Sequence, residues 1–292
     1  MYLEAHDSYG RSITSNELFI DVPHPFTYAD SSHRFLTVDN VGENFVLNGK
    51  IVSVKGFENP GDIFEPVGEH ENGQSEYTAV KSGYFACTVQ KDDLVRQVFL
   101  FVSPVESVHV ETNTLNWYRT QFNTGTLGNC GPATVSMAAA WAREKYVPVI
   151  NIRQKIGWRG DGGTNFDELI NVMGKNGVTA IQQHISSAED IFQIIDNGNI
   201  AIVLFHTGGI SHVKGDPAEN FFGKYYPDAV GHYVVIKGYS ADKQYFIVQD
   251  PIPSDWGSNS KRHHDTISMI GRNRYYDATE LMSSLRVKVV IK

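Results

Sequence analysis

The sequence predicts an α+β domain with an antiparallel sheet, preceded by an all-β sandwich. Up to about residue 105, short β-rich runs alternate with turn-rich pieces such as ENPGD and EHENGQSE, and helical periodicity is almost absent. After about residue 115, helical segments come first, and consecutive strands joined by tight turns follow them. These two observations divide the chain into a β-sandwich module at residues 1–105 and a mixed domain at residues 106–292.

The first module contains several short runs with the composition of strands. They read NELFIDV, HRFLTV, NFVLNGKIVSVKGF, SGYFACTVQ and RQVFLFVSPV. Several strands of this kind within about 80 residues are typical of a sandwich of two sheets. Residues 77–102, in which Gly83 and Tyr84 lead into a strand, resemble the last two strands of an immunoglobulin-like module. Because Cys87 lies in the alternating run YFACTVQ, we expect its side chain to pack in the core.

The second domain begins with helices and continues with strands. Helical spacing of apolar residues predicts helices at residues 131–145, 164–177, 187–198 and 277–285. Apolar runs predict strands at residues 200–205, 231–239, 244–250 and 286–292. Thr164 or Asn165 would cap the second helix, and Ser187 would cap the third.

Composition excludes several classes of function. The chain has 292 residues, of which 41% are hydrophobic and 12% aromatic, enough for a well-filled core. The net charge of −8 and the scattered basic residues argue against a nucleic-acid-binding surface. No apolar run approaches the ~18 residues of a membrane helix, so we expect no membrane insertion. The two cysteines of the chain can form neither a disulfide framework nor a CxxC zinc site.

Cys130 lies at the predicted start of a helix, after the glycine-containing approach TLGN. Pro132 falls in the first turn, where a missing N–H costs nothing. Because the unpaired N–H groups and the positive end of the helix dipole favour an anion there, the thiol pKa can drop from ~8.5 into a range of about 3.5 to 7.5. Cysteine is also a common small core residue, so simple packing is the alternative. Cys130 is therefore a candidate nucleophile that needs a base nearby.

A candidate base and a candidate acid follow on neighbouring strands. The chain contains eleven histidines, so a single histidine is weak evidence. His232 differs because it opens a strand and follows Gly231, which leaves room for a neighbouring group or a substrate. Asp250 ends the next strand before Pro251, a context that also favours aspartate in ordinary turns.

The register of the hairpin decides whether these two side chains can meet. If Tyr239 pairs with Tyr245, then Asp250 lies opposite Val234. Asp250 then shares a face with His232, at a diagonal of roughly 7 to 8 Å between backbones, which is close enough for a side-chain hydrogen bond. A slip of one residue would put the two side chains on opposite faces.

Three segments resemble, in order and spacing, the papain-like cysteine peptidases of the bacteriocin-processing, double-glycine type. They read NCGPATVSM, GHYVVIKGY and FIVQDP, and the resemblance covers about residues 115–290. It implies a papain-like fold with Cys130 as the nucleophile, His232 as the general base and Asp250 as the residue that fixes the imidazole tautomer. It also implies a peptide or protein substrate and no cofactor.

The same family supplies a glutamine upstream of the nucleophile as an oxyanion donor, beside the N–H of the cysteine itself. Gln121, in WYRTQFNTGTLGNC, is the only glutamine near Cys130. Gln121 and Cys130 are nine residues apart, which is more than the family's usual spacing between these two residues, so the segment NTGTLG would form a loop. An exposed polar residue is the alternative for Gln121.

Other motifs do not support a second chemistry. His206 and His212, and the neighbours His263 and His264, match no spacing of metal ligands, so we expect no metal. The GDGG turn at residues 160–163 lacks the strand and the lysine of a phosphate-binding loop.

Two long loops interrupt the sheet beside the candidate histidine and aspartate, at residues 207–230 and 251–275. Their aromatic residues would line a cleft or pack the loops down, and we favour packing. These residues are Phe221, Phe222, Tyr225, Tyr226 and Trp256.

The sequence therefore predicts a cysteine peptidase that acts on peptide or isopeptide bonds. A cell-wall peptide amidase with the same triad and a non-catalytic papain-like binding module are the alternatives, and the intact trio of residues argues against the module. We expect the β-sandwich to act as a spacer or binding region, as part of a larger polypeptide or a surface assembly. The opening residues lack the features of a secretory signal, whereas the immunoglobulin-like region favours the cell exterior, so a secreted or surface location is slightly favoured.

Overall fold

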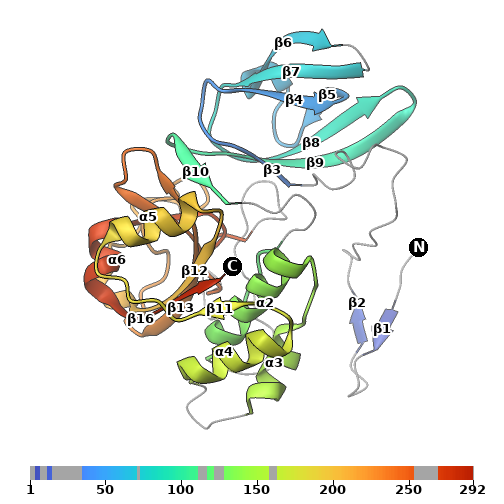
Figure 1. Cartoon of the computed structure of the whole chain (residues 1–292). Helices are drawn as coiled ribbons and strands as arrows, with labels where there is room; N and C mark the ends of the chain where they lie inside the picture. The colour runs from blue at the N-terminus through green and yellow to red at the C-terminus, as the bar shows by residue number, and fades with distance from the viewer. Residues whose placement is uncertain are drawn as a thin grey trace.

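The computed structural model describes residues 4–6, 12–14, 35–70, 73–110, 117–121, 128–157, 163–252 and 269–291. Figure 1 shows an all-β part, blue to blue-green, beside a mixed part that runs from green to red. A short hairpin of β1 (Glu4–His6) and β2 (Ser12–Thr14) precedes both parts in the sequence. The expected strand NELFIDV lies outside the described residues. None of the helices in the described ranges is long and apolar enough to cross a membrane.

The all-β part consists of two sheets around one core. One sheet has the order β3 (Phe35–Val38), β9 (Leu94–Val102), β8 (Gly83–Lys91), β5 (Lys50–Val54). The other has the order β4 (Asn44–Asn48), β7 (Gln74–Ala79), β6 (Phe64–His70), and the short helix η1 (Pro60–Asp62) precedes β6. Apolar residues of both sheets form one cluster, which contains Leu47, Val54 and Cys87. Within residues 35–102 the chain therefore forms two sheets over a shared core. The predicted core position of Cys87 is confirmed because its side chain is fully buried.

Strands β6 and β7 include much of EHENGQSE, whose composition predicts a turn. In β6 only Phe64 is buried, so the strand has no alternation of apolar and polar residues. A register shift between Pro66 and Gly68 interrupts its pairing with β7. Proline, charged residues and a bulge are features of an edge strand, and they hide such a strand from pattern analysis.

The mixed part contains five described α-helices, four of which were predicted. They are α2 (Cys130–Arg143), α3 (Val149–Ile156), α4 (Phe166–Lys175), α5 (Ala188–Asp196) and α6 (Ala278–Ser284). Helix α3 was not expected. Of the two proposed caps of α4, Asn165 is the residue at the N-cap position, where it forms a capping box with Glu168. Ser187 forms the corresponding box at α5 with Asp190, as predicted for the cap.

One antiparallel sheet connects these helices. Its order is β11 (Ala180–Ile181), β16 (Leu285–Ile291), β12 (Ile200–His206), β13 (Gly231–Ser240), β14 (Tyr245–Gln249), β15 (Arg274–Asp277). The short strand β10 (Ser107–His109) also pairs with β13, and the helix η3 (Thr207–Gly209) follows β12. Helices α2, α3 and α4 share a core with one face of the sheet, while α5 and α6 share a core with the other face. The predicted α+β class with an antiparallel sheet is confirmed.

The two parts are joined by a buried aromatic cluster. Tyr84 and Phe101 of the sandwich pack against Phe221, Ile247 and Tyr275 of the mixed part. The ring centroids of Phe101 and Phe221 are 5.5 Å apart. Because β10 is itself a strand of the larger sheet, the chain passes directly from the sandwich into that sheet (Figure 1).

Candidate active site

Cys130 is the first residue of α2, and a buried arginine from α3 holds the turn that leads to it. Arg153 donates from Nε to the side-chain oxygen of Asn129 and from Nη2 to the carbonyl of Gly128, both at 2.7 Å. The same guanidinium donates to the hydroxyl of Thr164 at 2.9 Å. Arg153 is only 2% exposed, so water competes little for these bonds. Arg153 thus ties the residues before the candidate nucleophile to the loop that leads into α4.

The imidazole of His232, at the start of β13, lies beside the Cys130 thiol and lowers its pKa. The backbone N–H groups of Tyr233 and Gly131 also face the sulfur and favour its anionic form. Because Nε2 of His232 is engaged by Asp250, the ring nitrogen left for the thiol is Nδ1. The structure therefore brings the predicted nucleophile and the predicted base into contact.

The pKa values of Cys130 and His232 are shifted in opposite directions. Burial alone raises the pKa of the Cys130 thiol, but the hydrogen bond and charge of His232 outweigh it and lower the pKa below its ordinary value. Burial alone lowers the pKa of His232, but the charge and hydrogen bond of Asp250, together with Cys130, raise it to about 10. A lowered thiol pKa and a raised imidazole pKa favour a thiolate beside an imidazolium at neutral pH.

The carboxylate of Asp250 is fully buried, and each of its oxygens accepts two hydrogen bonds. Oδ1 accepts from Nε2 of His232 at 2.8 Å and from the N–H of Ile252 at 2.9 Å. Oδ2 accepts from the hydroxyls of Tyr226 at 3.0 Å and Tyr276 at 2.5 Å. Burial raises the pKa of this carboxyl, but the charge and hydrogen bond of His232, together with the bonds from Tyr276 and Ile252, lower it below its ordinary value. The carboxylate therefore stays ionised at neutral pH.

A β-bulge sets the register that brings the histidine and the aspartate together. The expected pairing of Tyr239 with Tyr245 is wrong, because Tyr239 pairs with Phe246. The register then shifts between Ile236 and Gly238, where the strand contains one extra residue. Beyond this bulge the pairing follows the expected register, and the two side chains at the strand ends form their hydrogen bond.

Residues 117–121 pass beside the end of β14. The Tyr118 hydroxyl donates to the carbonyl of Asp250 at 2.7 Å. The Thr120 hydroxyl and the N–H of Gln121 donate to the carbonyl of Pro251 at 3.1 and 2.9 Å. Gln121 is 7% exposed and therefore buried, unlike an ordinary polar surface residue. The backbone of this segment is thus held against the end of the strand that carries Asp250.

The aromatic residues of the long loop before β13 pack inward. Phe221, Tyr225 and Tyr226 are buried, and Phe222 is half-buried against Tyr275. The preference for packing over an open cleft is confirmed for these loop residues. Trp256 and most of the second loop lie outside the described residues.

Sequence reasoning missed two side chains of this network, Arg153 and Tyr276. Arg153 lies in a helix that was not expected, and no local motif marks it. The sequence indicates Tyr276 only indirectly. A buried carboxylate needs several hydrogen-bond donors, and the segment RYYD at residues 274–277 supplies two tyrosine hydroxyls.

We also compared the described histidines outside this network with the requirements of a metal site. Within the described ranges, no group of three or more His, Cys, Asp or Glu side chains is arranged to hold a metal ion. Nδ1 of His206 accepts the N–H of Gly208 at 3.3 Å. His263 and His264 lie outside the described residues, as do residues 160–162 of the GDGG turn.

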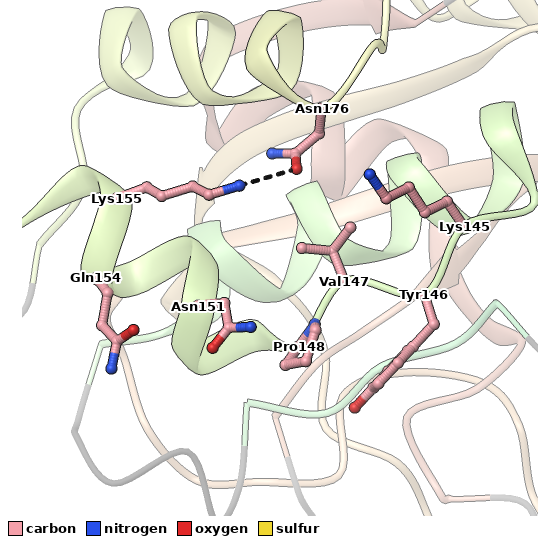
Figure 2. Close-up of a pocket in the computed structure, with 8 residues that line it drawn as sticks. All are labelled: Lys145, Tyr146, Val147, Pro148, Asn151, Gln154, Lys155 and Asn176. Carbon is pink, nitrogen blue, oxygen red and sulfur yellow. Dashed lines mark hydrogen bonds between the residues drawn. The ribbon is translucent and has the colours of Figure 1, made fainter. Parts of the chain in front are cut away.

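A polar hollow of about 540 Å³ lies at the other end of α2, between α3 and the end of α4. Figure 2 shows Lys145, Asn151 and Lys155 around it, with Nζ of Lys155 bonded to Oδ1 of Asn176 at 3.2 Å. Lys145 lies two residues beyond Arg143, the last residue of α2, whereas Cys130 is the first, so the hollow is separated from the thiol by the length of the helix.

Comparison with known proteins gives one family. The model of the Peptidase_C39 like family matches residues 112–280, which contain Cys130, His232 and Asp250 but not the β-sandwich. Among solved structures, a protein from Bacillus anthracis described as a C39-like peptidase is similar, with a TM-score of 0.38 and 13% sequence identity. That similarity covers 64% of this chain and 98% of the other. No curated protein matches the chain.

Proposed function

Because the chain belongs to the Peptidase_C39 like family, we propose that it is a cysteine peptidase that hydrolyses peptide or isopeptide bonds with Cys130 as its nucleophile. The observation that carries the proposal is the arrangement in which His232 lies beside the Cys130 thiol and is hydrogen-bonded to the buried Asp250. A nucleophile beside a base, which is in turn bonded to an orienting acid, is the arrangement that nucleophilic catalysis requires.

The proposed reaction is acyl transfer in two steps. The Cys130 thiolate attacks the carbonyl carbon of the scissile bond, and the N–H of the His232 imidazolium protonates the departing amine. The product is a thioester on Cys130 and a neutral imidazole. His232 then removes a proton from water, the water attacks the thioester, and the thiolate leaves with the carboxylic acid released.

Asp250 would hold the imidazole in the orientation and tautomer that these steps need. Its bond to Nε2 leaves Nδ1 directed to the sulfur, and its negative charge favours the imidazolium. We propose Gln121 and the N–H of Cys130 as donors to the oxyanion of the tetrahedral intermediate. The burial of Gln121, and the bonds of residues 118–121 to the carbonyls of Asp250 and Pro251, support a fixed position for this glutamine.

We further propose that the sandwich is an immunoglobulin-like module that carries the peptidase within a larger polypeptide or surface assembly. Its strand order supports this assignment: β4, β7, β6 in one sheet and β5, β8, β9 in the other correspond to the B-E-D and C-F-G orders of that fold. Strand β3 adds in parallel to β9 at the edge of the second sheet.

Hydrolysis by matched cysteine variants tests the proposed function. Wild type, Cys130→Ala and Cys87→Ala are incubated with an unfolded polypeptide and, separately, with purified peptidoglycan, and the products are identified by mass spectrometry. We expect wild type and Cys87→Ala to cleave the polypeptide and Cys130→Ala to cleave neither substrate, since Cys87 is buried in the sandwich. Cleavage of peptidoglycan alone would instead identify a cell-wall amidase. Equal cleavage by Cys130→Ala would exclude Cys130 as the nucleophile.

A further inference from the structure

We propose that Tyr226 and Tyr276 are positioning residues that hold the Asp250 carboxylate in the orientation that His232 requires. This inference rests on the proposed peptidase function. Neither tyrosine contacts the sulfur through a hydrogen bond of the network described above, so both would act through the carboxylate.

The hydrogen bonds leave the carboxylate one orientation. Each oxygen of an ionised carboxylate has about two acceptor positions. Oδ2 accepts the two phenol hydroxyls, and Oδ1 accepts Nε2 of His232 and the N–H of Ile252. Rotation of the Asp250 side chain would break bonds on both oxygens at a position that is closed to bulk solvent.

The two phenols are themselves held in place from separate elements. Tyr226 comes from the loop before β13, and its ring lies edge-on to Tyr225 with centroids 5.1 Å apart. Tyr276 comes from β15, and its ring packs 6.1 Å from that of Phe205 on β12. Both rings are fully buried, so phenylalanine can fill the same space and removes only the hydroxyl.

The hydroxyls of Tyr226 and Tyr276 should affect the pH at which Asp250 takes up a proton. The titratable groups that face or bond this residue are His232, Tyr118, Tyr225, Tyr226, Tyr276 and Arg274. Burial raises the pKa of both positioning tyrosines well above 10, with Asp250 adding to the shift, so they remain donors. A donor to a carboxylate favours its charged form, and its loss therefore raises the carboxyl pKa. When Asp250 takes up a proton, the imidazolium loses its anionic partner and the Cys130 thiolate loses stabilisation.

Alkylation of Cys130 measures this effect without a known substrate. Wild type, Tyr226→Phe, Tyr276→Phe and the double variant are treated with iodoacetamide across the acidic range, and modification of Cys130 is followed by mass spectrometry. Tyr275→Phe is the matched control, because it removes a buried hydroxyl on the same strand that bonds Ser107 instead. Near-UV circular dichroism checks the fold, and Tyr226→Phe alone tests the inference if Tyr276→Phe does not fold.

We expect the acidic limb of the alkylation profile to move to higher pH by about one unit in each single variant, and further in the double variant. The Tyr275→Phe profile should coincide with that of wild type. If wild type reacts rapidly in acid and the double variant has the same profile, the positioning role is wrong while the proposed function stands. If Cys130 of wild type reacts only as an ordinary thiol, the proposed function and this inference both fail.

Discussion

Nε2 of His232 lies 2.8 Å from Oδ1 of Asp250, and the two side chains are 2% and 0% exposed. A surface ion pair adds little stability because water and salt screen it, whereas the loss of one partner of a buried pair leaves a charge without compensation. This relationship therefore links the stability of the fold to the protonation of the candidate site.

The stabilisation from this pair should depend on pH in a defined direction. The folded pKa of Asp250 lies below its ordinary 3.8, so its contribution is present above 3.8 and is lost as the pH falls through the folded value. The folded pKa of His232 is raised from 6.5 to about 10, so its contribution is complete below 6.5 and is lost as the pH rises towards 10.

We therefore predict that His232→Ala lowers the free energy of unfolding most between pH 3.8 and 6.5. Urea unfolding of wild type and His232→Ala at about pH 5, 7.5 and 9.5 measures the difference. We expect this difference to shrink from the first pH to the last. A difference that grows with pH would contradict the raised pKa of His232.

Arg153 should support both the fold and the thiol. In Arg153→Lys the charge remains, but one ammonium cannot reproduce the bonds to Asn129, Gly128 and Thr164. We predict a loss of about 2 kcal/mol in the free energy of unfolding and slower alkylation of Cys130. Lys155→Ala on the same helix is the control, because Lys155 is exposed and should change stability by less than about 0.5 kcal/mol. Equal behaviour of the two variants would show that the arginine fork does not hold the turn.

Gly271 should not tolerate a side chain. A Cβ at this position would lie 2.1 Å from the carbonyl oxygen of Asp250 and 2.4 Å from the hydroxyl of Tyr225. We predict that Gly271→Ala destabilises the protein by about 2 kcal/mol or more and slows alkylation of Cys130, because Asp250 must move. Gly174→Ala in α4 is the matched control: no atom lies within 4 Å of its Cβ, so alanine should stabilise the helix by about 0.5–1 kcal/mol. Thermal unfolding of both variants measures these effects, and unchanged stability of Gly271→Ala would refute the close approach.

The residues of the proposed triad could be found from the sequence because each lies where an element begins or ends. Cys130 begins α2, His232 is the second residue of β13, and Asp250 directly follows β14. The register of the hairpin between β13 and β14 was harder to predict from the sequence. The pairing near the turn is displaced by one residue, and the bulge between Ile236 and Gly238 compensates for it. A bulge is defined by the pairing of one strand with its neighbour, so the local sequence of one strand does not reveal it.

The parts of the fold that escaped prediction are those with weak local signals. Strand β6 has one buried residue, and α3 is short, with only Val149, Ile152 and Arg153 buried. The bonds of Arg153 and Tyr276 to the site are contacts over long sequence separations. Burial and pairing of this kind become visible only when the sheet and its helices are assembled.

The pH dependence of Cys130 alkylation by iodoacetamide, in wild type and His232→Ala, tests the central claim most directly. Mass spectrometry separates Cys130 from Cys87, whose buried thiol has a pKa raised to about 12 and serves as the unreactive internal control. The lowered pKa of Cys130 predicts rapid modification below about pH 7 in wild type and the slow behaviour of an ordinary thiol in His232→Ala. If Cys130 reacts in both proteins only as the pH approaches that of an ordinary thiol pKa, the thiolate and imidazolium pair does not exist and the cysteine peptidase assignment is wrong.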